Sequence, residues 1–195
     1  MSDDLVDKVI AEIERFNASG IPVCFAPMGL GEQILYKKFF QTCERVKKIS
    51  KNARIVLVTN GVKLTEEDCE KILFYNLDEV SISLNANEQS IYSDHMGLDR
   101  YEMVRSNIER LFSFRNKSRA KKTSIFIQYI NFNDKKNDYS KDIQQWVRLM
   151  KNNDKCYVHP IVNQAGFHSE SSFIPKSKNH YPCTQPAWFI ATKVN

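Results

Sequence analysis

The fold of this chain is constrained most by a repeated alternation between short apolar segments and amphipathic segments. The apolar segments are rich in β-branched residues and lie at residues 21–29, 54–61, 78–86, 122–130 and 156–162. Between them, apolar residues recur at the spacing of one face of a helix. Nearly continuous apolar strands that alternate with helices are typical of a parallel sheet covered by helices. The sequence therefore predicts an α/β fold.

Length and composition favour one folded domain. The chain has 195 residues, of which 42% are hydrophobic and 26% charged, with only six glycines and six prolines. This is enough for one sizeable core, and it differs from the composition of disordered or fibrous chains. No apolar run approaches the roughly 20 residues that span a bilayer, and the N-terminus is acidic where a signal peptide would be basic. We therefore expect a cytoplasmic protein that does not enter the membrane.

The cysteines do not form a recognisable metal site. They are odd in number and widely spaced, without a CxxC pair, and we expect reduced thiols instead of a disulfide framework. The five positions are Cys24, Cys43, Cys69, Cys156 and Cys183.

Small polar residues follow every predicted strand. In a parallel sheet the carboxyl ends of the strands lie along one edge, and ligands bind there. Such side chains suit a ligand with amine, carboxylate and hydroxyl groups better than an apolar one. The candidate binding residues are Gly31, Glu32, Thr59, Asn60, Ser83, Asn85, Gln128 and Asn163.

Two other functions have weaker support. The segment "GLGEQI" has the first two glycines of a GxGxxG dinucleotide motif, but Ile34 stands where the third glycine belongs. The next strand ends in Thr59 and Asn60, without the acidic residue that binds the ribose of NAD. The basic run 115–122 could contact RNA, although a solvated loop between a helix and a strand explains it more simply. Nucleic acid is thus an unfavoured partner.

Four segments together resemble the radical S-adenosylmethionine (SAM) superfamily, in the branch that often has a C-terminal SPASM or twitch extension. They are "MGLGEQILYKKF", "IVLVTNGVKLTEEDCEKIL", "LDEVSISLNANEQSIY" and "YEMVRSNIERL". The resemblance implies a partial TIM-like (β/α)6 barrel with parallel strands, in which the first strand is missing. It divides the chain into a core at 1–166 and the start of an extension at 167–195.

The resemblance also implies roles for the strand-end residues. Gly31 and Glu32 match the end of the GGE motif, which holds the amino group of SAM. Thr59 and Asn60 would line the same site. Ser83 and Asn85 would bind the methionine carboxylate or the ribose. On the later strands, Gln128 would contact the ribose or the substrate, and Asn163 would lie near the adenine.

The chain departs from the family where the iron–sulfur cluster would be bound. The CxxxCxxC motif that holds a [4Fe-4S] cluster is absent. In the C-terminal segment Cys183 is the one candidate for an auxiliary cluster, and a lone thiol is the simpler interpretation. The resemblance thus predicts the core fragment of an enzyme that, with a cluster from upstream residues, generates a 5'-deoxyadenosyl radical to take hydrogen from an unidentified small-molecule or peptide substrate. The alternatives are a cluster-free SAM- or nucleotide-binding relative, an interaction module and, more weakly, a basic RNA-binding domain.

Overall fold

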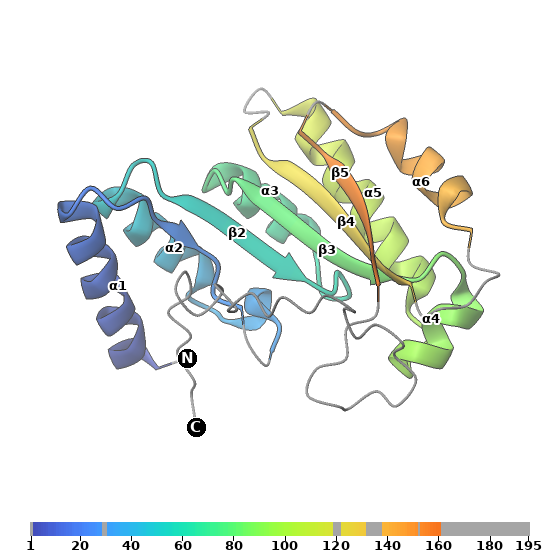
Figure 1. Ribbon diagram of the computed structural model, residues 1–195, viewed down its shortest axis with the longest axis horizontal. Helices are drawn as coiled ribbons and strands as arrows, with labels where there is room; N and C mark the ends of the chain where they lie inside the picture. The colour runs from blue at the N-terminus through green and yellow to red at the C-terminus, as the bar shows by residue number, and fades with distance from the viewer. Residues whose placement is uncertain (1, 29–30, 119–121, 132–137, 152, 161–195) are drawn as a thin grey trace, which may run out of the picture.

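The structure is a computed structural model, and it describes residues 2–28, 31–118, 122–131, 138–151 and 153–160. Helices and strands alternate along the chain (Figure 1). The elements are α1 (Asp3–Ala18), β1 (Cys24–Phe25), the 3-10 turn η1 (Gln33–Leu35), α2 (Phe39–Ile49), β2 (Arg54–Thr59), α3 (Glu66–Phe74), β3 (Glu79–Asn85), α4 (Gln89–Met96), α5 (Tyr101–Lys117), β4 (Ser124–Asn131), α6 (Ser140–Val147) and β5 (Lys155–Pro160).

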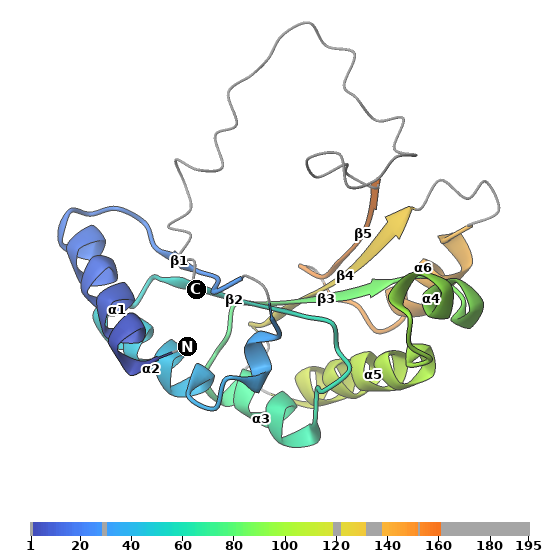
Figure 2. The same cartoon turned by 90° about the horizontal axis from the view of Figure 1, so that it is seen from below.

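The strands form one parallel sheet in the order β1-β2-β3-β4-β5. Consecutive strands are neighbours, and the sheet is curved, with the helices along its convex face (Figure 2). Each strand-to-strand connection therefore passes over the same side of the sheet, as in a barrel that is not closed. The predicted α/β class and the parallel, partial TIM-like barrel are confirmed.

The alternation of side chains along β3 separates the two faces of the sheet. Val80, Ile82 and Leu84 are fully buried in the hydrophobic core. Ser81 and Ser83 alternate with them and therefore point to the concave face. The core thus lies between the sheet and the helices, while the concave face presents polar side chains at its centre.

Two helices begin with side-chain caps. The side chain of Ser2 accepts a hydrogen bond from the backbone N–H of Leu5 at the start of α1. Thr65 and Asp68 form a capping box at the start of α3, in which each side chain accepts from the other residue's backbone N–H. These local signals fix where the two helices begin.

Three local predictions differ from the structure. The strand predicted at 21–29 has only two paired residues in β1, and Leu35, which the apolar periodicity of 35–49 would place on the buried face of a helix, is 62% exposed in η1. Helix α4 was not predicted from the sequence, since it buries only Tyr92 and therefore has no apolar stripe. Gly97, in the left-handed region at φ 67°, ends it.

The basic run 115–122 was expected to be a solvated loop, and this is wrong for its first residues. Arg115 lies in α5, is 2% exposed, and forms an ion pair with the buried carboxylate of Asp154. Asp154 also accepts from the backbone N–H groups of Ile125 and Lys151. Arg115 thus joins α5 to the amino-terminal ends of β4 and β5, a contact that a count of charges in the sequence does not reveal.

Among the described residues, no helix has both the length and the apolar character needed to cross a membrane.

Candidate functional site

The side chains of Glu32 and Gln33 extend the hydrogen bonding along the edge of β2. Strand β1 pairs with β2 only as far as Phe25, opposite Ile55. Further along β2, the backbone N–H of Val58 donates to Gln33 Oε1 at 3.0 Å, and that of Asn60 donates to Glu32 Oε2 at 2.9 Å. Two consecutive side chains therefore replace a strand at this edge, and they fix the Glu32 carboxylate at the carboxyl end of β2.

The second oxygen of this carboxylate has no donor. Glu32 Oε1 is buried and has no hydrogen-bond partner among the described residues, and the same holds for Gln33 Nε2 and Tyr36 Oη nearby. A buried polar atom left unpaired costs about 1–3 kcal/mol. A positively charged donor is the best partner for a carboxylate oxygen. The local geometry therefore fits a ligand ammonium group at Glu32.

A surface pocket of about 590 Å³ borders the same segment. Lys38 lies on its wall and is paired with Asp3 from the start of α1, at 2.7 Å. The other lining residues are Glu32, Leu35, Tyr36 and Lys37.

At the end of β2, the predicted residues Thr59 and Asn60 shape the loop. Thr59 Oγ1 accepts from the backbone N–H of Gly61 at 3.0 Å, and Asn60 Oδ1 accepts from that of Val62 at 2.9 Å. Gly61 lies in the left-handed region at φ 74°, and its carbonyl accepts from Asn107 Nδ2 of α5 at 2.8 Å. Both side chains hold the strand end in place, and the backbone of Asn60 contacts Glu32.

On the concave face, Ser83 and Gln128 lie side by side. They are register partners of β3 and β4, and Tyr157 of β5 continues the same row. Gln128 Nε2 donates to Ser81 Oγ at 2.6 Å, which holds the amide against β3. The structure therefore brings these two predicted residues together.

A bulge in β3 directs Asn85 away from the face on which Ser83 lies. The β3–β4 register shifts between Ser83 and Asn85, and Asn85 pairs with Tyr129, whose side chain is buried with the helices. Asn85 has φ 62°, and its Nδ2 contacts Met96 Sδ of α4 at 3.8 Å. Alternation alone would place Ser83 and Asn85 on one face, but the bulge separates them.

Some predicted residues lie outside the described part of the chain, and some residues near Glu32 were not predicted. Asn163, Cys183 and the segment 167–195 lie outside the described residues. Gln33 and Tyr36 were not predicted, although the position of Gln33 beside Glu32 is a signal that could have been used. Within the described ranges, no three His, Cys, Asp or Glu residues are close enough to hold a metal ion.

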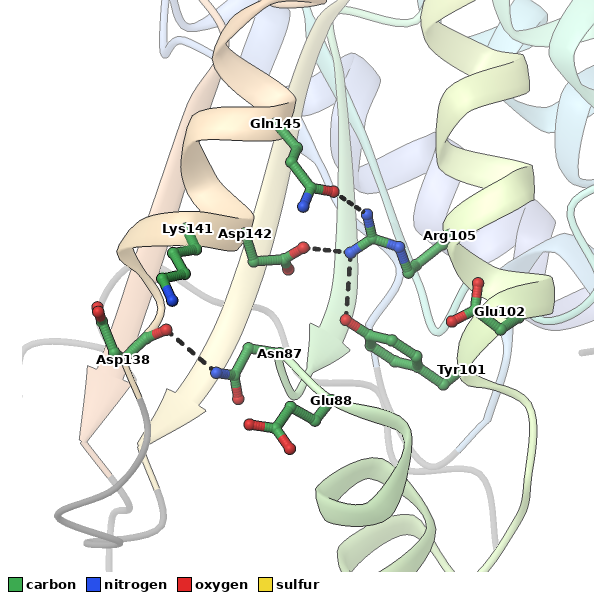
Figure 3. A pocket seen from close by; sticks show the side chains of 9 residues that line it. All are labelled: Asn87, Glu88, Tyr101, Glu102, Arg105, Asp138, Lys141, Asp142 and Gln145. Atoms are coloured by element: carbon green, nitrogen blue, oxygen red, sulfur yellow. Dashed lines mark hydrogen bonds and ion pairs between the residues drawn. The ribbon is translucent and has the colours of Figure 1, made fainter.

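A second pocket, of about 570 Å³, lies between the residues just before α4, helix α5, and helix α6 with the residue Asp138 before it, and includes none of the predicted residues (Figure 3). Its centre is the guanidinium of Arg105, which donates to Tyr101 Oη, Asp142 and Gln145 and stacks on the Trp146 ring, 4.8 Å from its centroid. Both terminal nitrogens of the guanidinium thus donate to protein atoms (Figure 3), which indicates a structural link between α5 and α6.

The same network continues into β4. Tyr129 Oη donates to Asp142 at 2.5 Å and accepts from Trp146 Nε1 at 2.7 Å. Burial and the Asp142 carboxylate raise the pKa of Tyr129, and burial raises the pKa of Tyr101 to about 12. Both phenols are therefore neutral at physiological pH and serve as hydrogen-bonding groups of the core.

Comparison with known proteins gives one family and one fold. Residues 2–155 match the family described as the radical SAM superfamily. No curated protein matches the chain.

Among solved structures, the chain is similar to native anSMEcpe with bound AdoMet, at a TM-score of 0.58 and 16% sequence identity. The match covers 83% of this chain and 43% of that chain. The complex of native anSMEcpe with AdoMet and the Cp18Cys peptide gives a TM-score of 0.57 and 18% identity, and covers 82% and 43% of the two chains. The chain therefore spans less than half the length of these proteins, and at this identity the likeness establishes the fold.

Proposed function

This chain belongs to the radical SAM superfamily, and from that premise we propose that it is the SAM-binding core of a radical SAM enzyme. Solved structures of the same fold hold AdoMet, which supports SAM as the ligand. The resemblance of Gly31 and Glu32 to the GGE motif supports the position of its amino group.

The unpaired oxygen of Glu32 is the observation that carries this proposal. The backbone N–H of Asn60 fixes Oε2, so Oε1 is held in place before any ligand binds. An ammonium group supplies a positive charge and three donors, and it is therefore a suitable partner for this oxygen.

The other predicted residues have roles that we propose from their positions or, for Asn163, from the family resemblance alone. Thr59 and Asn60 hold the backbone to which Glu32 is bound. Ser83 and Gln128 face the concave side, where we propose that they contact the ribose or the methionine carboxylate. Asn85 would support the loop before α4, and Asn163 is proposed to lie near the adenine.

The residues of this chain do not fit an iron–sulfur cluster. The sequence has no CxxxCxxC motif, and no described metal-ligand group replaces it. We propose that radical chemistry on SAM depends on a [4Fe-4S] cluster whose ligands come from outside this sequence. The cytoplasmic location and the SPASM-type extension at 167–195 stay predictions. The substrate is not identified.

Isothermal titration of the purified chain tests SAM binding and the role of Glu32. Wild type should bind SAM with one site, and Glu32→Gln should weaken it about 10- to 100-fold, because a charge-assisted hydrogen bond contributes about 1.5–3 kcal/mol. The same substitution should leave the affinity for 5'-methylthioadenosine unchanged, since that nucleoside has no amino group. Glu44→Gln on α2, where Glu44 pairs only with exposed Lys48, is the matched control.

Two results would contradict the proposal. If SAM does not bind the wild-type chain, the ligand is wrong. If Glu32→Gln weakens SAM and 5'-methylthioadenosine equally, Glu32 acts through the fold of the loop and does not hold the ammonium.

A further inference from the structure

The concave side of β4 and β5 contains an unbroken group of aromatic side chains. Register partners of parallel strands point to the same face, so Phe126 lies opposite Lys155 and Gln128 opposite Tyr157. His159 follows two residues later on the same face of β5. The described helices cover the opposite face of the sheet (Figure 2).

The rings contact one another. Phe126 and Tyr157 meet edge to face, with centroids 5.6 Å apart, and Tyr157 and His159 lie 5.7 Å apart. The ammonium of Lys155 sits 5.9 Å from the Phe126 ring. Phe126 and Tyr157 are half-buried, while Lys155 and His159 are exposed. The four side chains form a continuous surface with Lys155 at one end and His159 at the other, which we call the β5 wall.

The β5 wall contains no acidic side chain. No carboxylate side chain alternates onto the concave face of β4 or β5. On β3 the nearest acid on this face is Glu79, which is already paired with Arg54 of β2. Among the described residues, a ligand that lies on the β5 wall therefore meets aromatic rings and the positive charge of Lys155.

We propose that the β5 wall binds an aromatic, anionic group of the substrate, which carries a carboxylate or a phosphate. The inference rests on the proposed function, because Tyr157 continues the row of Ser83 and Gln128 and so places the β5 wall beside the proposed SAM site. The ligand ring packs against Tyr157 and Phe126, and the anion pairs with Lys155 or accepts a hydrogen bond from His159. The β5 wall selects the substrate by shape and charge.

The test uses small probes and the purified chain, with binding followed by NMR titration of the ¹⁵N-labelled protein. Phenylacetate and phenyl phosphate, which distinguish the two anions, should bind at least about tenfold more tightly than phenethylammonium, since the last has the opposite charge. Tyr157→Leu should weaken phenylacetate about three- to tenfold through the lost ring contact. Lys155→Gln should weaken phenylacetate and leave neutral phenylacetamide unchanged. Val158→Thr alters the opposite face of β5, where Val158 is 41% exposed, and should have no effect.

Three results would overturn the inference: equal binding of phenethylammonium and phenylacetate, wild-type affinity in folded Tyr157→Leu, or competitive displacement of phenylacetate by SAM. If Tyr157→Leu does not fold, the test uses Lys155→Gln and His159→Gln, because both change exposed side chains. The effect of these substitutions on phenylacetate binding then decides the question. If phenylacetate binds and SAM does not, the proposed function fails while the β5 wall stands as a binding site. If SAM binds and no probe does, only the β5 wall fails.

Discussion

The Glu32 carboxylate accepts a hydrogen bond of 2.9 Å from the backbone N–H of Asn60, 28 positions further along the chain. This bond ties the loop after β1 to the end of β2. One carboxylate oxygen therefore stabilises the fold, while the other is left without a donor in the described residues. Substitutions at Glu32 can separate these two roles, because an amide keeps an acceptor oxygen and an alkyl side chain does not.

We predict that Glu32→Leu lowers the free energy of unfolding by about 1 kcal/mol, because the N–H of Asn60 loses its acceptor. Glu32→Gln should remain within about 0.5 kcal/mol of wild type, since the amide oxygen can accept the same bond. Equilibrium unfolding in urea measures both values. Equal stability of Glu32→Leu and wild type would show that the bond has no net effect on folding.

Gly61 and Gly20 provide a matched pair of glycine substitutions. Both lie in the left-handed region, at φ 74° and 69°. A Cβ on Gly61 would lie 3.0 Å from Val104 Cγ1 and 3.1 Å from Ile82 Cγ2, whereas one on Gly20 would meet no atom within 4 Å. Gly20→Ala should therefore cost about 1–2 kcal/mol of backbone strain, and Gly61→Ala should cost about 1–3 kcal/mol more from overpacking. Thermal unfolding of the two variants checks the difference, and equal losses would contradict it.

The buried ion pair of Arg115 and Asp154 should dominate the stability of the edge formed by β4 and β5. Arg115→Met leaves the Asp154 carboxylate buried without its guanidinium, and we expect a loss of about 3–5 kcal/mol. Lys117→Met, two residues away on α5 at an exposed position, should change stability by less than about 0.5 kcal/mol. Urea unfolding compares the two variants, and a loss below about 1 kcal/mol for Arg115→Met would refute the assignment.

Stability should fall above pH 9. Burial raises the pKa of the Cys43, Cys69 and Cys156 thiols to about 12, from an ordinary value of 9.0. Each thiol then ionises first in the unfolded chain, so the native state retains more protons. The stability contribution is complete below pH 9 and is lost as the pH rises toward 12.

Urea unfolding at pH 8, 9 and 10.5 measures this loss. Cys69→Ala should reduce the slope of stability against pH by up to about 1.4 kcal/mol per pH unit, because one fewer group titrates. The substitution also removes a buried sulfur, so the slope and not the absolute stability is the test. An unchanged slope would show that Cys69 does not contribute.

Local sequence signals predicted the elements that depend on local interactions. The apolar runs of β2, β3 and β4 predicted buried parallel strands, and Thr65 followed by Asp68 three residues later is the local pattern of the capping box in α3. The sequence also predicted that Glu32, Asn60, Ser83 and Gln128 lie along one edge, whereas the structure places Ser83 and Gln128 side by side on the concave face, with Gln128 in the middle of β4. These inferences need only the period of a strand, the period of a helix and the direction of the chain.

Contacts between distant residues decided the rest. The bulge after Ser83 turned Asn85 toward α4, although alternation predicted the opposite face. Arg115 became buried because Asp154, 39 positions away, pairs with it. The sequence alone thus determined which segments form the strands of the sheet. Only the tertiary structure decided which polar atoms near the strand ends are paired and which, like Glu32 Oε1, have no donor among the described residues, because such pairing joins atoms far apart in the chain.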